Sequence, residues 1–173
     1  CFIGRSQNIV SISDGNASTC NGTLFDTGGQ GGTGYSDNES FTLTICPDNA
    51  NDIITLNFLT FALSTVNTAA APNNNADNLT IYDGDNTNAT SLGTYTGNQL
   101  QGLVVTCTSL NTTGCLTLVW ESNDQGTGVF AASISCSTPC DRPTVSMVSP
   151  TVPQNPQRIC LGDNVSFDGS TSF

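Results

Sequence analysis

The chain of 173 residues contains 14 Asp and Glu, 3 Lys and Arg and no histidine, which gives a formal net charge of -11. The three cations are Arg5, Arg142 and Arg158, so chemistry that depends on histidine or lysine is excluded, including Ser-His-Asp triads, histidine metal sites and P-loops. The same charge repels polyphosphate and anionic lipid, so neither nucleic acid nor a membrane surface is expected as a partner.

Composition and cysteine content favour an extracellular β-protein. Only 10% of the residues are charged, and Asn, Thr, Ser and Gly must supply the polar surface. Eight cysteines without paired C-x2-C spacing indicate disulfides formed in an oxidising compartment. No apolar stretch reaches the roughly 18 residues of a membrane span and no leader-like segment opens the chain. We therefore expect a mature, secreted or cell-surface form, without membrane insertion.

Short runs of alternating apolar and polar residues recur along the chain, separated by clusters of Gly, Asn and Asp. A period of two is typical of half-buried strands, and no convincing helical period accompanies it. Strands are predicted over 9–12, 41–45, 53–63, 79–82, 103–106, 116–120 and 130–134. Buried faces are predicted for Phe41, Leu43 and Ile45, for Ile54, Leu56 and Phe58, and for Leu116, Leu118 and Trp120. Seven or more strands at this spacing indicate an all-β, antiparallel sandwich.

Two turn-forming segments and one change of composition organise the rest of the chain. Residues 28–34 are rich in glycine, and Asp83-Gly84-Asp85-Asn86 has the composition of a hairpin turn. Beyond Cys136 the chain is rich in proline and loses its alternation. We therefore predict one domain over 1–138 and the first part of a second β-sandwich module over 139–173, which is too short to bury a core by itself.

The eight cysteines are expected to be fully paired. Cys107 and Cys115 flank a short loop between two predicted strands, which favours a local bridge. A disulfide between Cys20 and Cys46 would close the segment between these two residues, which has about the length of a hairpin. Three pairings are open for the remaining four cysteines, and the favoured one joins Cys1 to Cys136 and Cys140 to Cys160.

An ordered set of segments resembles the CUB domain family over roughly residues 7 to 136. The segments are 20–29 (CNGTLFDTGG), 34–39 (GYSDNE), 41–47 (FTLTICP), 56–63 (LNFLTFAL), 77–84 (DNLTIYDG), 92–97 (LGTYTG), 115–120 (CLTLVW) and 130–136 (FAASISC). The resemblance implies a jelly-roll type β-sandwich that acts as an extracellular binding module.

The sequences of these segments are similar to those of CUB-like domains in large cell-surface proteins of the Bacteroidetes. Residues 159–169 (ICLGDNVSFDG) resemble the opening of a PKD domain, which often follows such domains. This resemblance implies a type IX secreted protein of the gliding-adhesin kind, or an enzyme with appended modules.

The same resemblance implies a calcium site, because many CUB domains bind calcium through loop carboxylates at one end of the sandwich. The family positions fall on Asp77, on the pair Asn123 and Asp124, and on Tyr35, which orients a ligand. The family glutamate falls on Ser64, which is a departure, and Asp26 or Asp37 is expected to replace it. The alternative is that Asp77 only caps a turn.

Three single features of the sequence allow other interpretations. Asp26-Thr27-Gly28 has the local sequence of an aspartic protease, whose two carboxylates share a proton, but no second such motif exists. Trp120, Tyr82 and Tyr95 could form a sugar platform, although the alternation of Trp120 with Leu118 favours core packing. Seven N-x-S/T sequons matter only if the source is eukaryotic.

These observations predict an extracellular, non-enzymatic binding or adhesion module with a protein or glycan ligand at the cell surface, within a longer chain. An accessory module of a secreted hydrolase is the second hypothesis. An aspartic protease that uses Asp26 is the third.

Overall fold

The structure is a computed structural model that describes residues 8–67 and 76–139. Over these ranges the chain forms strands and no helix, so no helix there could span a membrane. The strands are β1 (Asn8–Ser11), β2 (Gly15–Ser18), β3 (Asn21–Phe25), β4 (Ser40–Cys46), β5 (Ile53–Ala62), β6 (Asn78–Asp83), β7 (Thr90–Tyr95), β8 (Val104–Thr106), β9 (Leu116–Glu121) and β10 (Val129–Ser137).

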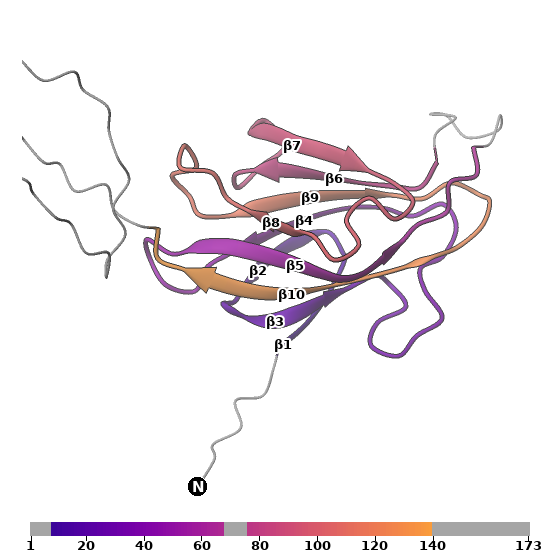
Figure 1. Ribbon diagram of the computed structural model, residues 1–173, viewed down its shortest axis with the longest axis horizontal. Helices are drawn as coiled ribbons and strands as arrows, with labels where there is room; N and C mark the ends of the chain where they lie inside the picture. Colours follow the sequence, from indigo (N-terminus) through magenta and orange to yellow (C-terminus); the bar gives the residue numbers. More distant parts are fainter. Residues whose placement is uncertain (1–7, 68–75, 140–173) are drawn as a thin grey trace, which may run out of the picture. The chain divides into compact units, whose positions relative to one another are not determined.

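The strands form two five-stranded sheets that pack as a sandwich, drawn as two layers in Figure 1. The first sheet has the order β1-β3-β10-β5-β8, and the second has the order β2-β4-β9-β6-β7. The long central pair of the first sheet is β10 with β5, which runs antiparallel from Val129↔Ala62 to Ser137↔Ile53 with one bulge at Ala131/Ala132. The all-β sandwich predicted from the sequence is confirmed.

The sheets are mixed rather than fully antiparallel. β1 pairs with β3 and β2 pairs with β4, both in parallel. The first four strands alternate between the two sheets, so neighbours in one sheet are two connections apart in sequence and run in the same direction. The expectation of a purely antiparallel sandwich was therefore wrong at these two edge pairs.

All seven strands predicted from alternation are present, and three further strands were missed. The missed strands are β2, β3 and β7. Each is rich in Gly, Asn, Ser or Thr and lacks a regular row of large apolar residues, so its sequence resembles a turn. These segments become strands because neighbouring strands complete their backbone hydrogen bonds.

The core lies between the sheets and uses the faces predicted from alternation. Ile54, Leu56 and Phe58 of β5 are fully buried, and Leu116, Leu118 and Trp120 of β9 are fully buried in the opposite sheet. Burying a side chain of this size stabilises a fold by about 1.5 to 3 kcal/mol. The indole of Trp120 contacts the rings of Tyr35 and Phe130 at centroid distances of 4.6 and 5.1 Å. The core prediction for Trp120 is confirmed.

The disulfides join strands that are neighbours in a sheet, and they differ from the predicted pairs. Cys20 bonds Cys136, next to the Asn21↔Ser135 pair of β3 and β10, and Cys46 bonds Cys115, next to the Ile45↔Leu116 pair of β4 and β9. The predicted bridges Cys20–Cys46, Cys107–Cys115 and Cys1–Cys136 were therefore wrong. Proximity along the chain does not reveal that β3 lies beside β10.

Cys107 is a buried free thiol in the structure, so the expectation that every cysteine is paired was wrong as well. Its Sγ lies 3.2 Å from the Gly114 carbonyl oxygen, and burial raises the pKa of the thiol to about 11. The predicted Cys140–Cys160 bridge lies outside the described residues.

The chain divides into two units, Cys1–Thr138 and Pro139–Phe173. All but Pro139 of the second unit lies outside the described residues, so its identity as a PKD-like module stays a prediction.

Candidate functional site

Three connections between strands meet at one end of the sandwich, at the right of Figure 1. We define the loop end as residues 26–39, 63–67, 76–77 and 122–128. Backbone hydrogen bonds join two of these segments, 26–39 and 122–128: the amide of Tyr35 donates to the Gly128 carbonyl at 3.2 Å, and the amide of Asn38 donates to the Asn123 carbonyl at 2.8 Å. The loop end therefore has a defined backbone frame.

Asp77 is the buried centre of the loop end, with no exposed surface. Its Oδ2 accepts the Tyr35 hydroxyl at 2.6 Å, and its Oδ1 accepts the Asn123 amide N–H at 2.8 Å. The Tyr35 oxygen also accepts the Ser64 amide at 2.9 Å. The structure thus brings together three residues that the sequence singled out, and Asp77 ties all three connections rather than capping one turn.

Burial dominates the electrostatics of this carboxylate. Desolvation raises the pKa of Asp77 above its ordinary value, and the hydrogen bonds from Tyr35 and Asn123 oppose that effect. The nearby charges of Asp37 and Glu39 raise the pKa further. Burial and the hydrogen bond to Asp77 likewise raise the pKa of the Tyr35 hydroxyl, so it remains a proton donor.

Asp26 holds the glycine-rich loop against the sandwich. Its Oδ2 accepts the amide of Phe130 at 2.9 Å and its Oδ1 accepts the amide of Gly28 at 2.8 Å. Burial is the main reason that the pKa of Asp26 is raised. Both oxygens are thus bonded to backbone donors rather than to a second carboxyl, which gives no support to the protease hypothesis.

Glu39 is a loop-end residue that sequence reasoning missed. Its Oε1 accepts the Thr27 hydroxyl at 2.6 Å and the Ser36 amide at 3.0 Å, and its Oε2 accepts the Trp120 indole N–H at 3.0 Å. Trp120 is 81 residues away in sequence, so no local spacing signals this pair. Glu39 satisfies the one polar atom of the buried indole.

The predicted calcium ligands meet the chemistry of a hard cation only in part. Asp124 has a buried Oδ1 without a hydrogen-bond partner, which suits a cation ligand. The side chain of Asn123, in contrast, is used by Val66 and Gln125, and Ser64 donates to the Gln125 carbonyl where the family has its glutamate. Both oxygens of Asp26 accept backbone amides, and both oxygens of Asp77 accept hydrogen bonds from Tyr35 and Asn123. The calcium site therefore stays a prediction.

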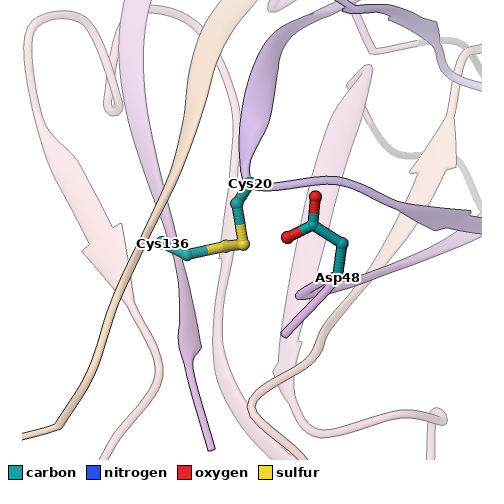
Figure 2. A group of neighbouring side chains, drawn as sticks. All are labelled: Cys20, Asp48 and Cys136. Atoms are coloured by element: carbon teal, nitrogen blue, oxygen red, sulfur yellow. A yellow bond between two sulfur atoms is a disulfide. The ribbon is translucent and has the colours of Figure 1, made fainter. Parts of the chain in front are cut away.

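Only one group of three potential metal ligands clusters within the described residues, and it lies away from the loop end. It comprises Cys20, Cys136 and Asp48, whose ligand atoms lie within 4.8 Å of one another. Figure 2 shows that the two sulfur atoms are bonded to each other. A disulfide lacks the thiolates that bind metals, so the oxidised group is not a metal site.

The structure also bears on two other sequence predictions, the turn role of Asp83 and the aromatic sugar platform. Asp83 closes the 107–115 loop by accepting the Thr108 amide at 3.1 Å and the Asn111 side-chain amide at 2.8 Å, which is more than the predicted turn role. Tyr82 and Trp120 lie on opposite faces of their sheet, because Tyr82 follows the inward-facing Ile81 and Trp120 is in the core. They therefore do not form one sugar platform.

The fold matches known structures, although no family model and no curated protein matches the sequence. The full extracellular region of zebrafish Gpr126/Adgrg6 superposes with a TM-score of 0.55 at 16% identity, over 73% of this chain and 15% of that one. The CUB1-EGF-CUB2 region of human MASP-1/3 superposes with a TM-score of 0.52 at 15% identity, over 79% of this chain and 49% of that one.

These likenesses define the fold, which is a CUB-like β-sandwich. The resemblance read from the sequence is confirmed at this level. The chain spans less than half the length of either similar structure.

Proposed function

We propose that this chain is an extracellular, non-catalytic binding module of a longer, multi-domain protein. The observation that carries the proposal is the CUB-like sandwich, because the similar structures are an extracellular region and a CUB-containing fragment. Two disulfides among the described residues suit an oxidising compartment.

The loop end is the proposed ligand surface, and its chemistry favours a cationic group on a protein or glycan. All three arginines lie outside the described residues, which contain eleven carboxylates and no Lys, Arg or His. Asp37 is exposed at the loop end, and Asp124 and Glu39 are half-buried there. Complementary charge accelerates association and selects partners.

Binding of a lysine-rich peptide, with the same peptide carrying glutamine in place of lysine as the reference, tests the proposed surface. We expect Asp37→Asn and Asp124→Asn each to weaken binding about fivefold at low salt. Asp85→Asn, which removes an exposed charge from the β6–β7 turn, should leave binding unchanged. Equal losses in all three variants would show unspecific attraction by net charge and refute a site at the loop end.

We also propose calcium as a ligand of the loop end, with Asp77 and Asp124 supplying carboxylate oxygens and Tyr35 positioning Asp77. Bound calcium would offset the concentration of negative charge. The melting temperature in millimolar calcium should then be higher than in chelator. The gain in the free energy of unfolding should be about 2.7 kcal/mol when free calcium is at a hundred times Kd. Asp124→Asn should abolish the difference, and superimposable wild-type curves would refute the proposal.

The assignment to a particular kind of cell-surface protein rests on the sequence resemblance alone. We propose a bacterial cell-surface protein of the gliding-adhesin kind, exported by type IX secretion and continuing into a PKD-like module. The sequence of the full-length gene tests this, since a catalytic domain elsewhere in it would instead favour the accessory module of a secreted hydrolase.

A further inference from the structure

The Cys20–Cys136 disulfide has a carboxylate beside it. An oxygen of Asp48 and both sulfur atoms lie within 4.8 Å of one another, and Figure 2 shows the carboxylate directed toward the bridge. Both cysteines are half-buried and Asp48 is exposed. The bridge is thus only partly covered, and a thiol that approaches it from the side of Asp48 passes close to a negative charge.

Nothing in the described part of the chain neutralises this charge with a side-chain cation. All Lys and Arg residues fall outside residues 8–67 and 76–139, and the chain has no histidine. Among residues 8–67 and 76–139, therefore, no side-chain cation offsets the Asp48 charge, and dissolved salt screens it.

Reduction of a disulfide creates negative charge at the sulfur atoms. A thiolate attacks one sulfur, the S–S bond breaks, and a mixed disulfide forms while the other cysteine leaves as a thiolate. A second thiolate then attacks the mixed disulfide, releases an oxidised low-molecular-weight disulfide, and leaves both cysteines reduced. Two electrons come from the two small thiols, and the cysteine thiolates take protons from water. Since Asp48 lies near both sulfurs, it opposes the attack and the departure whichever sulfur reacts.

We propose that Asp48 is an electrostatic guard of the Cys20–Cys136 disulfide, which slows its reduction by anionic thiols. The bridge links Cys20, which directly precedes β3, to Cys136 in β10 across 116 residues of sequence, so reduction would remove the covalent link between these two neighbouring strands. An anionic thiol of the glutathione type is the class of reductant that the guard excludes most strongly.

The second disulfide supplies an internal reference. Among the described residues no carboxylate lies within 4.8 Å of both sulfurs of Cys46–Cys115. The rate at which Cys46–Cys115 is reduced should therefore depend less on the charge of the attacking thiol. This dependence should not change when Asp48 is replaced.

The test compares reduction of each bridge by mercaptoacetate, which is anionic, and by cysteamine, which is cationic, at equal thiolate concentration. Alkylation and peptide mass analysis of the full chain give the two rates at each bridge. At low salt, Asp48→Asn should raise the anionic-to-cationic rate ratio at Cys20–Cys136 about three- to tenfold. High salt should shrink this gain, because screening acts on the same interaction.

Two control variants separate charge from structure. Asp48→Glu keeps the charge and should retain the wild-type ratio, whereas Asp37→Asn removes one charge at the loop end and should not change the ratio at Cys20–Cys136. Equal acceleration by both thiols in Asp48→Asn would mean that Asp48 acts through packing and would overturn the proposal. An unchanged ratio in that variant would overturn it as well.

Discussion

At the scale of single residues, Asp77 shows how a buried carboxylate is held by hydrogen bonds, since residues 8–67 and 76–139 contain no cationic side chain. Its two oxygens accept a tyrosine hydroxyl and a backbone amide, and these bonds favour the charged form against burial. A buried acceptor that lost a donor would be left with its desolvation cost uncompensated. Tyr35 is therefore as important to the loop end as the carboxylate that it contacts.

Replacing Tyr35 by phenylalanine removes this donor and leaves the ring packed on Trp120. We expect the free energy of unfolding to fall by about 1 to 3 kcal/mol, because Asp77 loses one bond and the Ser64 amide loses its acceptor. Urea denaturation measures the change. Tyr95→Phe, which removes a hydroxyl bonded to the Leu92 carbonyl, is the matched control with a smaller expected loss. Equal losses would contradict a special role for Tyr35.

The raised pKa of Asp77 predicts a specific dependence of stability on pH. A carboxyl whose pKa is higher in the folded than in the unfolded state binds its proton more tightly when folded. The contribution of protonated Asp77 to the free energy of unfolding is therefore fully present below about 3.8, the pKa of this carboxyl in the unfolded chain. It is lost as the pH rises through the raised pKa of the folded state. In Asp77→Asn, the free energy of unfolding should decline less over this rise in pH than in the wild type.

Calcium-free denaturation curves at several pH values above 3.8 test this prediction. Asp85→Asn removes an equal charge from an exposed turn and serves as the reference. A steeper decline in Asp77→Asn than in the wild type would contradict the direction of the shift.

At the scale of elements, the β3–β4 and β9–β10 connections pack through glycine backbone. Gly34 has a φ of 106°, and a Cβ there would lie 2.0 Å from the Gly128 carbonyl oxygen. Gly29 also has a positive φ, 70°, but a Cβ there would meet no atom within 4 Å. Glycine is thus required at position 34 because the two connections approach closely there. At position 29 it is required only for its backbone conformation.

Alanine at these two glycines separates strain from packing. Both substitutions should cost about 1 to 2 kcal/mol of backbone strain. Gly34→Ala should cost at least about 1 to 3 kcal/mol more, because rigid backbone must move to admit the methyl group. Equal losses of unfolding free energy would show that the two connections separate without cost.

At the scale of the whole molecule, uncompensated charge is the main electrostatic feature. The described part contains eleven carboxylates and no side-chain cation, so charge pairs among its side chains are only repulsive. Self-repulsion of this kind destabilises a compact state, and salt screens it over a length that falls from about 30 Å at 0.01 M to about 8 Å at 0.15 M.

Sodium chloride should therefore stabilise the domain. Between about 0.01 and 0.15 M we expect a rise of roughly 1 kcal/mol, or about 4 °C in melting temperature. Thermal melting in chelator excludes a contribution from trace calcium. A fall in melting temperature over this range would contradict net repulsion as the dominant interaction.

The sequence by itself determined the features that depend on local alternation and composition. A period of two identified seven strands and the inward faces of β4, β5 and β9, because side-chain direction along a strand is set by backbone geometry alone. The CUB-like segments also located Tyr35, Asp77 and Asn123, which the fold brings into direct contact.

Only the tertiary structure decided the features that depend on which strands become neighbours. Cys20 bonds Cys136 because β3 lies beside β10, and Glu39 reaches Trp120 because β4 lies beside β9. The parallel pairing of β1 with β3 and of β2 with β4, and the position of Asp48 beside the Cys20–Cys136 disulfide, follow in the same way. Strand pairing is fixed by burial and backbone hydrogen bonding over the whole sandwich, so no local stretch of sequence contains it.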